Sequence, residues 1–264
     1  PATLAELLRS THVHGRAGHR ADPSRLLSAT HPGLYVAGAD GAVQRVSQTQ
    51  DDFMGFTPHP SDPLRLYASG HPAAGGNLGF VASQDGGRTW TPLAPGVSGP
   101  VDFHQMDVSP LDPLVVYGVW GALQVSRDGG KTWAIVGEEL EGVADLAASA
   151  LAVDTLYLAT RSGLRVSRDG GRHWAAARAG EESASLVQTG PGGTLYAFVS
   201  RVGLLRAQES DLRWELVSNG FGNAAVQHLA VDPRNPRRMF ASTHRNELLA
   251  STDGGRTWQA LAKR

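Results

Sequence analysis

The octapeptide "SRDGGKTW" at residues 126–133 decides the fold, because the chain repeats it. Near-copies read "SQDGGRTW" at 83–90, "SRDGGRHW" at 167–174 and "STDGGRTW" at 251–258, and a decayed copy, "QESDLRW", ends at Trp214. The closing tryptophans lie 43, 41, 40 and 44 residues apart. A period of about 40–45 residues is typical of four-stranded propeller blades. The sequence therefore predicts an all-β fold, a six-bladed β-propeller that forms a single domain over residues 11–264, after an N-terminal extension at 1–10.

The residue types of the octapeptide indicate a tight turn between the third and fourth strands of a blade. Asp-Gly-Gly supplies residues that tolerate positive φ. The Ser, Asp and Thr side chains can bond the amides of the turn, and Trp can pack beneath it. These octapeptides closely resemble Asp-boxes, the repeats of the sialidase-like (BNR) superfamily. The resemblance implies a β-propeller, commonly secreted or periplasmic, in which the box is a structural turn away from the ligand face. It assigns that structural role to Ser83, Asp85, Ser126, Asp128, Ser167, Asp169, Ser251 and Asp253.

A second repeated segment lies upstream of each box and ends in residues that strand packing does not explain. It reads "DPSRLLSATH" at 22–31, "DPLRLYASGH" at 62–71 and "NPRRMFASTH" at 235–244. The Asp-Pro or Asn-Pro pair predicts the turn between the first and second strands of a blade. The second strands of the six blades are then expected to end, in order, at His31, His71, Gly121, Arg161, about Arg201, and His244.

The same register predicts what occupies the start of the first strand in each blade. His14, Met54 and His104 take nearly the same position, and Gln227 or His228 takes it in the sixth blade. Neighbouring strands of a blade are antiparallel, so the start of the first strand and the end of the second share one face. We therefore expect these residues to meet the strand-exit histidines at one mouth of the central channel.

Imidazole and thioether side chains together favour a transition metal ion as the ligand of this site. Imidazole suits copper, zinc, nickel and iron, whereas thioether sulfur selects copper. Met54 and Met106 therefore favour copper over zinc, and Asp52 and Asp102, two residues before Met54 and His104, could orient the imidazoles. The predicted metal ligands are His14, His31, Met54, His71, His104, Met106, His228 and His244.

Other residues of the same face are compatible with an organic ligand, and several functions stay open. Arg161 and Arg201 could bind a small ligand together with Asp52 and Asp102. Trp120, the only tryptophan outside a box besides the decayed copy, could stack on a glycan or anchor a peptide. The main hypothesis is a ligand-binding propeller with a His- and Met-lined site. The alternatives are a glycoside hydrolase or carbohydrate-binding protein of the sialidase-like superfamily, and a protein-interaction propeller similar to assembly factors. An enzyme would be a glycoside hydrolase or a metal-dependent hydrolase.

Composition limits the partners further. The net charge of −1 and the pI of about 6.9 give no basic surface for nucleic acid. Without cysteine, the chain has no disulfide or thiolate metal site. No apolar run approaches the ~20 residues of a membrane span. The chain begins at Pro1 rather than Met, so we expect a secreted or periplasmic protein that has lost its signal peptide, and a monomer.

Overall fold

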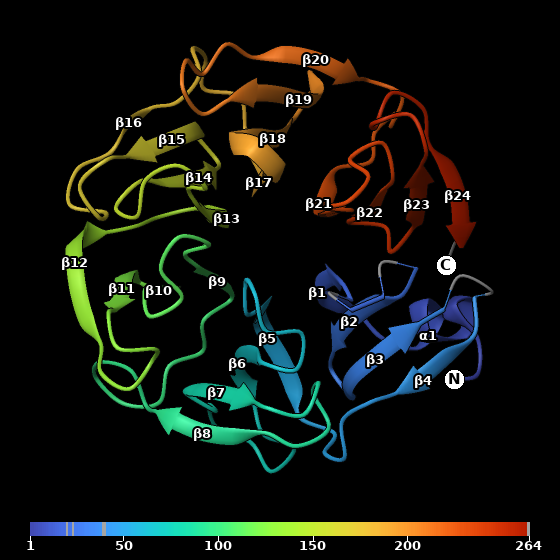
Figure 1. Cartoon of the computed structure of the whole chain (residues 1–264), viewed down its shortest axis with the longest axis vertical. Coiled ribbons are helices and arrows are strands. Elements are labelled where there is room, and N and C mark those ends of the chain that lie inside the picture. Colours follow the sequence, from blue (N-terminus) through green and yellow to red (C-terminus); the bar gives the residue numbers. More distant parts are fainter. Residues whose placement is uncertain (20, 23, 39–40, 263–264) are drawn as a thin grey trace. The chain divides into compact units, whose positions relative to one another are not determined.

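A computed structural model describes residues 1–264 except residues 20, 23, 39, 40, 263 and 264. The fold is a six-bladed β-propeller, in which each blade is a four-stranded antiparallel sheet built from consecutive strands (Figure 1). The chain divides into two compact units, residues 1–136 and 137–263, and each is described by itself. None of the helices in the described residues is long and apolar enough to cross a membrane.

The first unit holds three blades. The first blade consists of β1 (Val13–Gly18), β2 (Leu26–Thr30), β3 (Gly33–Ala37) and β4 (Val43–Arg45). The second consists of β5 (Asp52–Pro58), β6 (Leu66–His71), β7 (Phe80–Ser83) and β8 (Thr91–Ala94). The third consists of β9 (Gln105–Val108), β10 (Val116–Trp120), β11 (Ala122–Ser126) and β12 (Ala134–Glu139), whose last residues pass into the second unit.

The N-terminal extension is a short helix, α1 (Leu4–Ser10), held against the first blade. Thr3 and Glu6 form a reciprocal capping box that satisfies amides at its start. Leu7 and Leu8 are fully buried, and the Leu4 amide donates to the carbonyl of Gly41. The sequence predicted a first blade without a complete box, from "GADGAVQRV", but Ala39 and Asp40 of that turn lie outside the described residues.

The second unit holds the other three blades. The fourth blade consists of β13 (Val143–Ala148), β14 (Leu156–Thr160), β15 (Gly163–Ser167) and β16 (Ala175–Ala176). The fifth consists of β17 (Ala184–Thr189), β18 (Thr194–Val199), β19 (Gly203–Gln208) and β20 (Glu215–Ser218), with a 3₁₀ turn, η1 (Pro191–Gly193), before β18. The sixth consists of β21 (Val226–Val231), β22 (Met239–Thr243), β23 (Leu248–Ser251) and β24 (Gln259–Ala262). The single-domain assignment of the whole chain stays a prediction.

The four complete boxes form the predicted turns between third and fourth strands. In the box of the third blade, the Ser126 hydroxyl donates to Asp128 Oδ1 at 2.8 Å. That oxygen also accepts the amides of Lys131 and Thr132 at 3.0 and 2.9 Å. The Trp133 indole N–H donates to the carbonyl of Gly130 at 3.0 Å, and the ring is half-buried. These bonds stay within the turn, so the box carboxylates accept hydrogen bonds that stabilise the turn.

The decayed copy in the fifth blade contains an anchor of a different kind, Glu209. Glu209 is buried, and its carboxylate accepts the Ser149 hydroxyl, the Ala150 amide at 2.9 Å and the Tyr157 hydroxyl at 3.1 Å. Burying a carboxylate is tolerated when several donors satisfy its oxygens. The fourth and fifth blades are therefore joined by a polar network where the box is missing.

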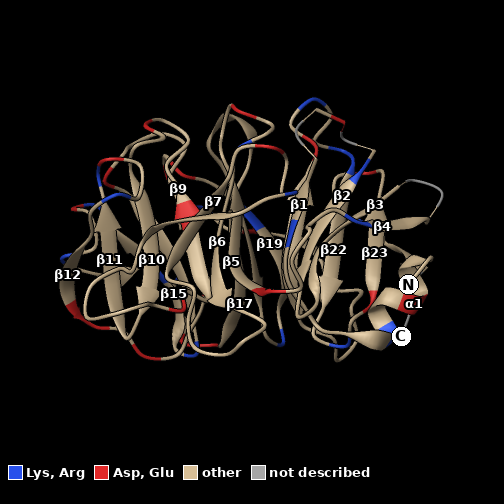
Figure 2. Ribbon diagram, turned by 90° about the horizontal axis from the view of Figure 1, so that it is seen from below, with Lys and Arg blue, Asp and Glu red and all other residues tan. Residues whose placement is uncertain are grey.

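Within a blade, the boxes and the predicted ligand residues lie at opposite ends of the strands. In the box of the second blade, the Gly86 amide donates to the carbonyl of Leu64, just before β6 begins. His71 lies at the other end of the same strand. Six strand residues span about 20 Å. In the ribbon of Figure 2, most of the segments coloured for charged residues lie in the turns and loops at the strand ends. The strand ends therefore carry the polar chemistry of the molecule.

Candidate functional site

Strand pairing aligns the six blades residue by residue. In each blade, the first residue of the second strand that pairs with the first strand has a fixed partner there, as Leu66 pairs with Pro58 and Val116 with Val108. Counting from this pair, we call the residue six positions before the first-strand partner the entry position. The residue five positions after the second-strand partner is the exit position. The exit positions hold His31, His71, Gly121, Arg161, Ser200 and His244. The entry positions hold His12, Asp52, Asp102, Gly142, Ser183 and Ala225.

This register places two acidic side chains next to exit histidines. Only Asp52 and Asp102 are acidic among the entry positions, and both belong to the first unit. Each contacts the exit histidine of the preceding blade, His31 and His71 respectively. A histidine from the start of a first strand, His14 or His104, completes each group. We call His14, His31 and Asp52 the first cluster, and His71, Asp102 and His104 the second cluster.

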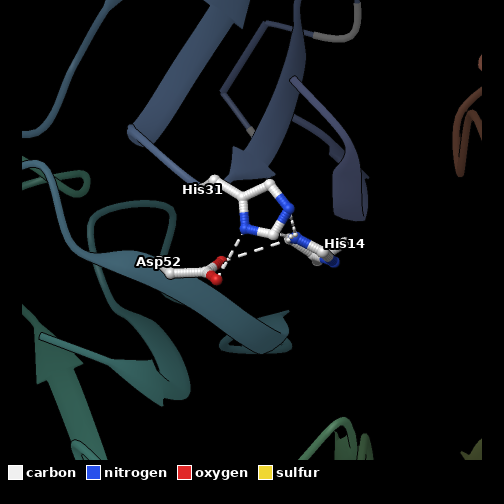
Figure 3. Close-up of side chains that lie close together, drawn as sticks. All are labelled: His14, His31 and Asp52. Carbon is white, nitrogen blue, oxygen red and sulfur yellow. Dashed lines mark hydrogen bonds and ion pairs between the residues drawn. The ribbon is translucent and has the colours of Figure 1, made fainter. Parts of the chain in front are cut away.

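The first cluster joins the first and second blades (Figure 3). The His31 Nδ1 atom lies 2.7 Å from Asp52 Oδ2, and the His14 Nε2 atom lies 3.4 Å from Asp52 Oδ1. The two imidazoles meet at 3.2 Å between His14 Nε2 and His31 Nδ1. His14 is the most buried member, with a side chain 17% exposed. Its position follows from a β-bulge between Val13 and Gly15, which turns the intervening residue out of the strand pairing.

The second cluster joins the second and third blades. Asp102 Oδ2 lies 3.1 Å from His71 Nε2 and 2.7 Å from His104 Nε2. Here the carboxylate is the buried member, because its side chain is 4% exposed against 42% for His71 and 49% for His104. Its other oxygen, Oδ1, is buried and has no hydrogen-bond partner among the described residues.

The protonation of His71 is constrained by its neighbours. Its Nδ1 atom lies 2.8 Å from the carbonyl oxygen of Gly76, which can only accept a hydrogen bond. The Nδ1 atom therefore carries the proton, and Nε2 of the neutral ring presents a lone pair to Asp102. Two acceptors face each other across 3.1 Å. Either a second proton on His71 or a bound cation is needed between them.

Burial and hydrogen bonding move the pKa values of the two clusters in opposite directions. Desolvation lowers the pKa of His14 to about 4, and the charge of Asp52 opposes this only in part. The hydrogen bond to Asp102 raises the pKa of His104 above its ordinary value of 6.5, against the effect of burial. The first cluster therefore keeps His14 neutral in mildly acidic solution, whereas the second cluster holds a proton more tightly.

Both of the predicted methionine ligands are buried. Met106 on β9 is buried in a core cluster with Phe103 and Val108, so its sulfur packs against apolar side chains. Met54 on β5 is also buried, at the position equivalent to His14 and His104. The donor atoms that the clusters bring together are imidazole nitrogens and carboxylate oxygens.

The remaining predicted residues divide between the two units. Trp120 ends β10 in the first unit, at the same end of that sheet as His104, and is 44% exposed. In the second unit, Arg161 holds an exit position and is exposed. The register gives the next exit position to Ser200 rather than Arg201, which follows it at a φ of 65°.

His228 and His244 belong to the sixth blade, in the second unit. His244 holds the exit position, but its Nδ1 accepts the amide of Ala225 at 3.0 Å. Gln227, not His228, takes the position equivalent to His14, because His228 pairs with Ser242 past the bulge of β21.

Sequence reasoning missed the contribution of the loop between β6 and β7. Gly76 fixes the His71 ring, and Asp51 holds the loop by accepting the amide of Ala73 at 3.0 Å. Gly75 and Gly76 both have φ near +90°, which the "AAGGN" segment could have signalled. Asp52 and Asp102, expected to orient imidazoles from behind, lie among the donor atoms themselves.

Comparison with known proteins agrees with the turn geometry. The family described as BNR/Asp-box repeat matches residues 124–134, which include the whole third-blade box. The chain is a six-bladed β-propeller with Asp-box turns. No curated protein sequence matches this Asp-box propeller.

Solved structures share the fold of this Asp-box propeller. The GH74 xyloglucanase from Xanthomonas campestris is 24% identical with a TM-score of 0.65, and the GH74 enzyme from Niastella koreensis is 19% identical with a TM-score of 0.72. Each match covers 95% of this chain but only 45% of the enzyme, so the chain spans less than half the length of these relatives. A structure described as YCF48 bound to D1 peptide is 16% identical with a TM-score of 0.61, over 96% of this chain and 82% of that one. At these identities the likeness concerns the fold alone.

Proposed function

We propose that the chain is a metal-binding propeller whose two clusters each hold one divalent transition metal ion through two imidazoles and one carboxylate. The carrying observation is that an exit histidine meets an entry aspartate twice, at equivalent positions of successive blades, with a second histidine each time. A repeated packing contact would not need the same three residue types, although His31 approaches its aspartate through Nδ1 and His71 through Nε2.

The separation of the donor atoms supports this proposal. Bonds of about 2.0–2.2 Å from zinc to nitrogen or oxygen place tetrahedral ligand atoms about 3.3–3.6 Å apart. The contacts of the first cluster are 2.7–3.4 Å long, and those of Asp102 in the second are 2.7 and 3.1 Å. An ion entering either cluster would require side-chain shifts of less than about 1 Å, and three donors leave a coordination position for water or a further ligand.

The electrostatics of the second cluster supports it independently. Asp102 carries a buried oxygen without a partner, and a buried carboxylate is costly unless a cation balances it. His71 donates from Nδ1 to a backbone carbonyl, which is the usual arrangement behind an imidazole that binds metal through Nε2. A divalent ion would satisfy both features at once.

The choice of metal follows from the donor set. The two methionines of the sequence favour copper. The nitrogen and oxygen donors of the two clusters suit zinc and divalent copper alike. Both ions are therefore tested. The glycosidase and protein-interaction alternatives have support from the fold likeness and from the exposed Trp120.

The test uses protein produced without a His-tag and stripped with a chelator. Isothermal titration with zinc chloride and copper chloride, and metal analysis after dialysis, should give two ions per chain for the wild type and one for either His31→Ala or His71→Ala. His173→Ala is the matched control, because this histidine is 88% exposed and contacts only its own box. The proposal fails if the wild type binds no more metal than the His31→Ala/His71→Ala double variant.

A further inference from the structure

A separate cavity of about 190 Å³ lies in the second unit, where Trp174 of the fourth-blade box forms one wall. Its apolar lining includes Val143 and Leu158, and its polar lining includes Glu139, Glu141 and Arg165. It shares no residue with the two clusters. Pockets for drug-sized ligands occupy about 300–1,000 Å³, so this one fits a single small ring.

One wall of the cavity lies where the second and third blades carry a phenylalanine. In the second blade Phe53 lies 4.5 Å from the box residue Trp90, measured between ring centroids, and in the third Phe103 lies 5.0 Å from Trp133. Val143 holds the equivalent position in the fourth blade, five residues before the one that pairs with Leu156. A valine leaves unfilled the space that a phenylalanine ring takes beside the other boxes.

Trp174 also differs from the other box tryptophans in its hydrogen bonding. Trp90, Trp133 and Trp258 donate their indole N–H to a glycine of their own turn at 2.8–3.0 Å. No such bond joins Trp174 to the described residues. Its half-buried ring keeps an indole donor for a ligand beside an apolar face on which a ring can stack.

The charges around the cavity select the class of ligand. Glu139 and Glu141 oppose an anionic ligand, and Arg165 opposes a cationic one. Together they offer acceptors and donors to a neutral molecule with many hydroxyl groups. The Ser162 hydroxyl, 3.4 Å from an Arg165 guanidinium nitrogen, adds a polar group to the same wall.

We propose that this cavity binds one neutral sugar residue, stacked on Trp174 and hydrogen-bonded by Glu139, Glu141 and Arg165. The sixth blade also has a valine, Val226, at this position, but there the ring of Phe221 lies 5.7 Å from that of the box residue Trp258. The proposal does not depend on metal binding, because the clusters lie in the first unit.

The test follows the indole N–H resonances of the full chain by ¹H–¹⁵N NMR. The Trp174 signal is identified by its loss in Trp174→Phe. Methyl glycosides of glucose, galactose and xylose, glucuronate as an anion and glucosamine as a cation are each titrated to 50 mM. We expect at least one neutral glycoside to shift the Trp174 signal, with glucuronate and glucosamine at least fivefold weaker.

The plug variant Val143→Phe restores the residue of the second and third blades and should weaken binding at least tenfold. Glu141→Gln, at an exposed residue, is the second variant should the plug disturb folding, and it should weaken binding at least threefold. Trp133→Phe, at the equivalent box position, should leave binding unchanged. The proposal is overturned if no neutral glycoside shifts the Trp174 signal, if a charged sugar binds best, or if both Val143→Phe and Glu141→Gln bind as the wild type does.

Discussion

The two clusters use the same three residue types on equivalent strand ends but bury different members. In the first cluster one imidazole and the carboxylate are sheltered alike, since His14 is 17% exposed and Asp52 is 20% exposed. In the second cluster the carboxylate is sheltered, since Asp102 is 4% exposed and both imidazoles are more than 40% exposed. Burial lowers the pKa of His14, whereas the hydrogen bond to Asp102 raises the pKa of His104 against the effect of burial. The balance between burial and the hydrogen bond to the carboxylate, rather than the set of residue types, decides how these two histidines respond to pH.

The sharpest way to break this comparison is to remove the buried carboxylate. Asp102→Asn should weaken metal binding at the second cluster by about 100-fold, because it removes a charged donor, and should leave the first cluster unchanged. Titration calorimetry should then show one tight site per chain instead of two. Asp112→Asn, in the turn between β9 and β10 of the same blade, is the control and should keep both sites. Equal weakening of both clusters by Asp102→Asn would show that they act as one site.

Acid should separate the clusters without any mutation. Metal must displace protons from its imidazole ligands. The pKa of His104 is raised above 6.5, so at pH 5.5 proton competition should weaken the second cluster at least tenfold relative to pH 7.5. His14, with a pKa of about 4, adds almost no competition in this range.

Zinc titrations of His31→Ala and of His71→Ala at pH 7.5, 6.5 and 5.5 isolate one cluster each. The protein with only the first cluster should lose less affinity than the protein with only the second. Identical pH dependence in the two variants would contradict the assigned proton affinities.

The metal-free protein offers a direct measure of the same difference. Imidazole NMR signals should show His14 neutral until the pH approaches 4 and His104 protonated above pH 6.5. Asp102→Asn should lower the pKa of His104, because the hydrogen bond that the imidazole donates to the Asp102 carboxylate is the main cause of its rise, and should hardly move the pKa of His14. A His104 pKa at or below 6.5 in the wild type would remove the contrast.

These pKa values also set opposite effects on stability. For His14, the unfolded chain binds a proton between pH 6.5 and about 4 that the folded chain does not, so stability falls as the pH drops through this window. For His104, the folded chain holds the proton more tightly, so its stabilising contribution is complete below pH 6.5 and is lost as the pH rises through the folded pKa. The free energy of unfolding in urea should be measured against pH for both variants. His14→Gln should remove the loss of stability toward acid, and His104→Gln should remove the loss of stability as the pH rises.

The sequence predicted the fold in detail because each box carries its own turn chemistry, and the spacing of the boxes fixes the blades. It also placed His31 and His71 at strand ends, since strand length alone decides that. It did not show that an entry aspartate would pair with the exit histidine of the preceding blade, because this contact depends on how neighbouring blades pack. One large cluster was expected, whereas the first unit brings together two groups of three.

The orientation of Met106 shows the limit of reasoning from alternation. His104 and Met106 are two residues apart, which suggests a shared face along a strand. The strand β9 begins only at Gln105, so His104 lies outside the regular pleat and turns to Asp102, while Met106 packs into the core. A residue just before a strand is not bound by the period of two, and the sequence does not show where pairing begins.

The smallest expected effect concerns the loop that sets the His71 ring. Gly76 has a φ of +90°, and an added Cβ would meet no atom within 4 Å, so Gly76→Ala strains the backbone without a clash. Movement of its carbonyl should loosen the hydrogen bond to His71 Nδ1 and weaken zinc binding at the second cluster about threefold to tenfold. This loss is small compared with the effect of removing a hydrogen-bond partner of a metal-binding histidine altogether. Gly192→Ala is the control, because Gly192 also has positive φ and open space but lies in the second unit. Both substitutions should cost similar stability, and only Gly76→Ala should change zinc affinity and the ¹⁵N signal of His71 Nδ1. If Gly192→Ala weakens zinc binding as much, backbone strain in general is responsible, and the carbonyl of Gly76 does not position His71 for metal.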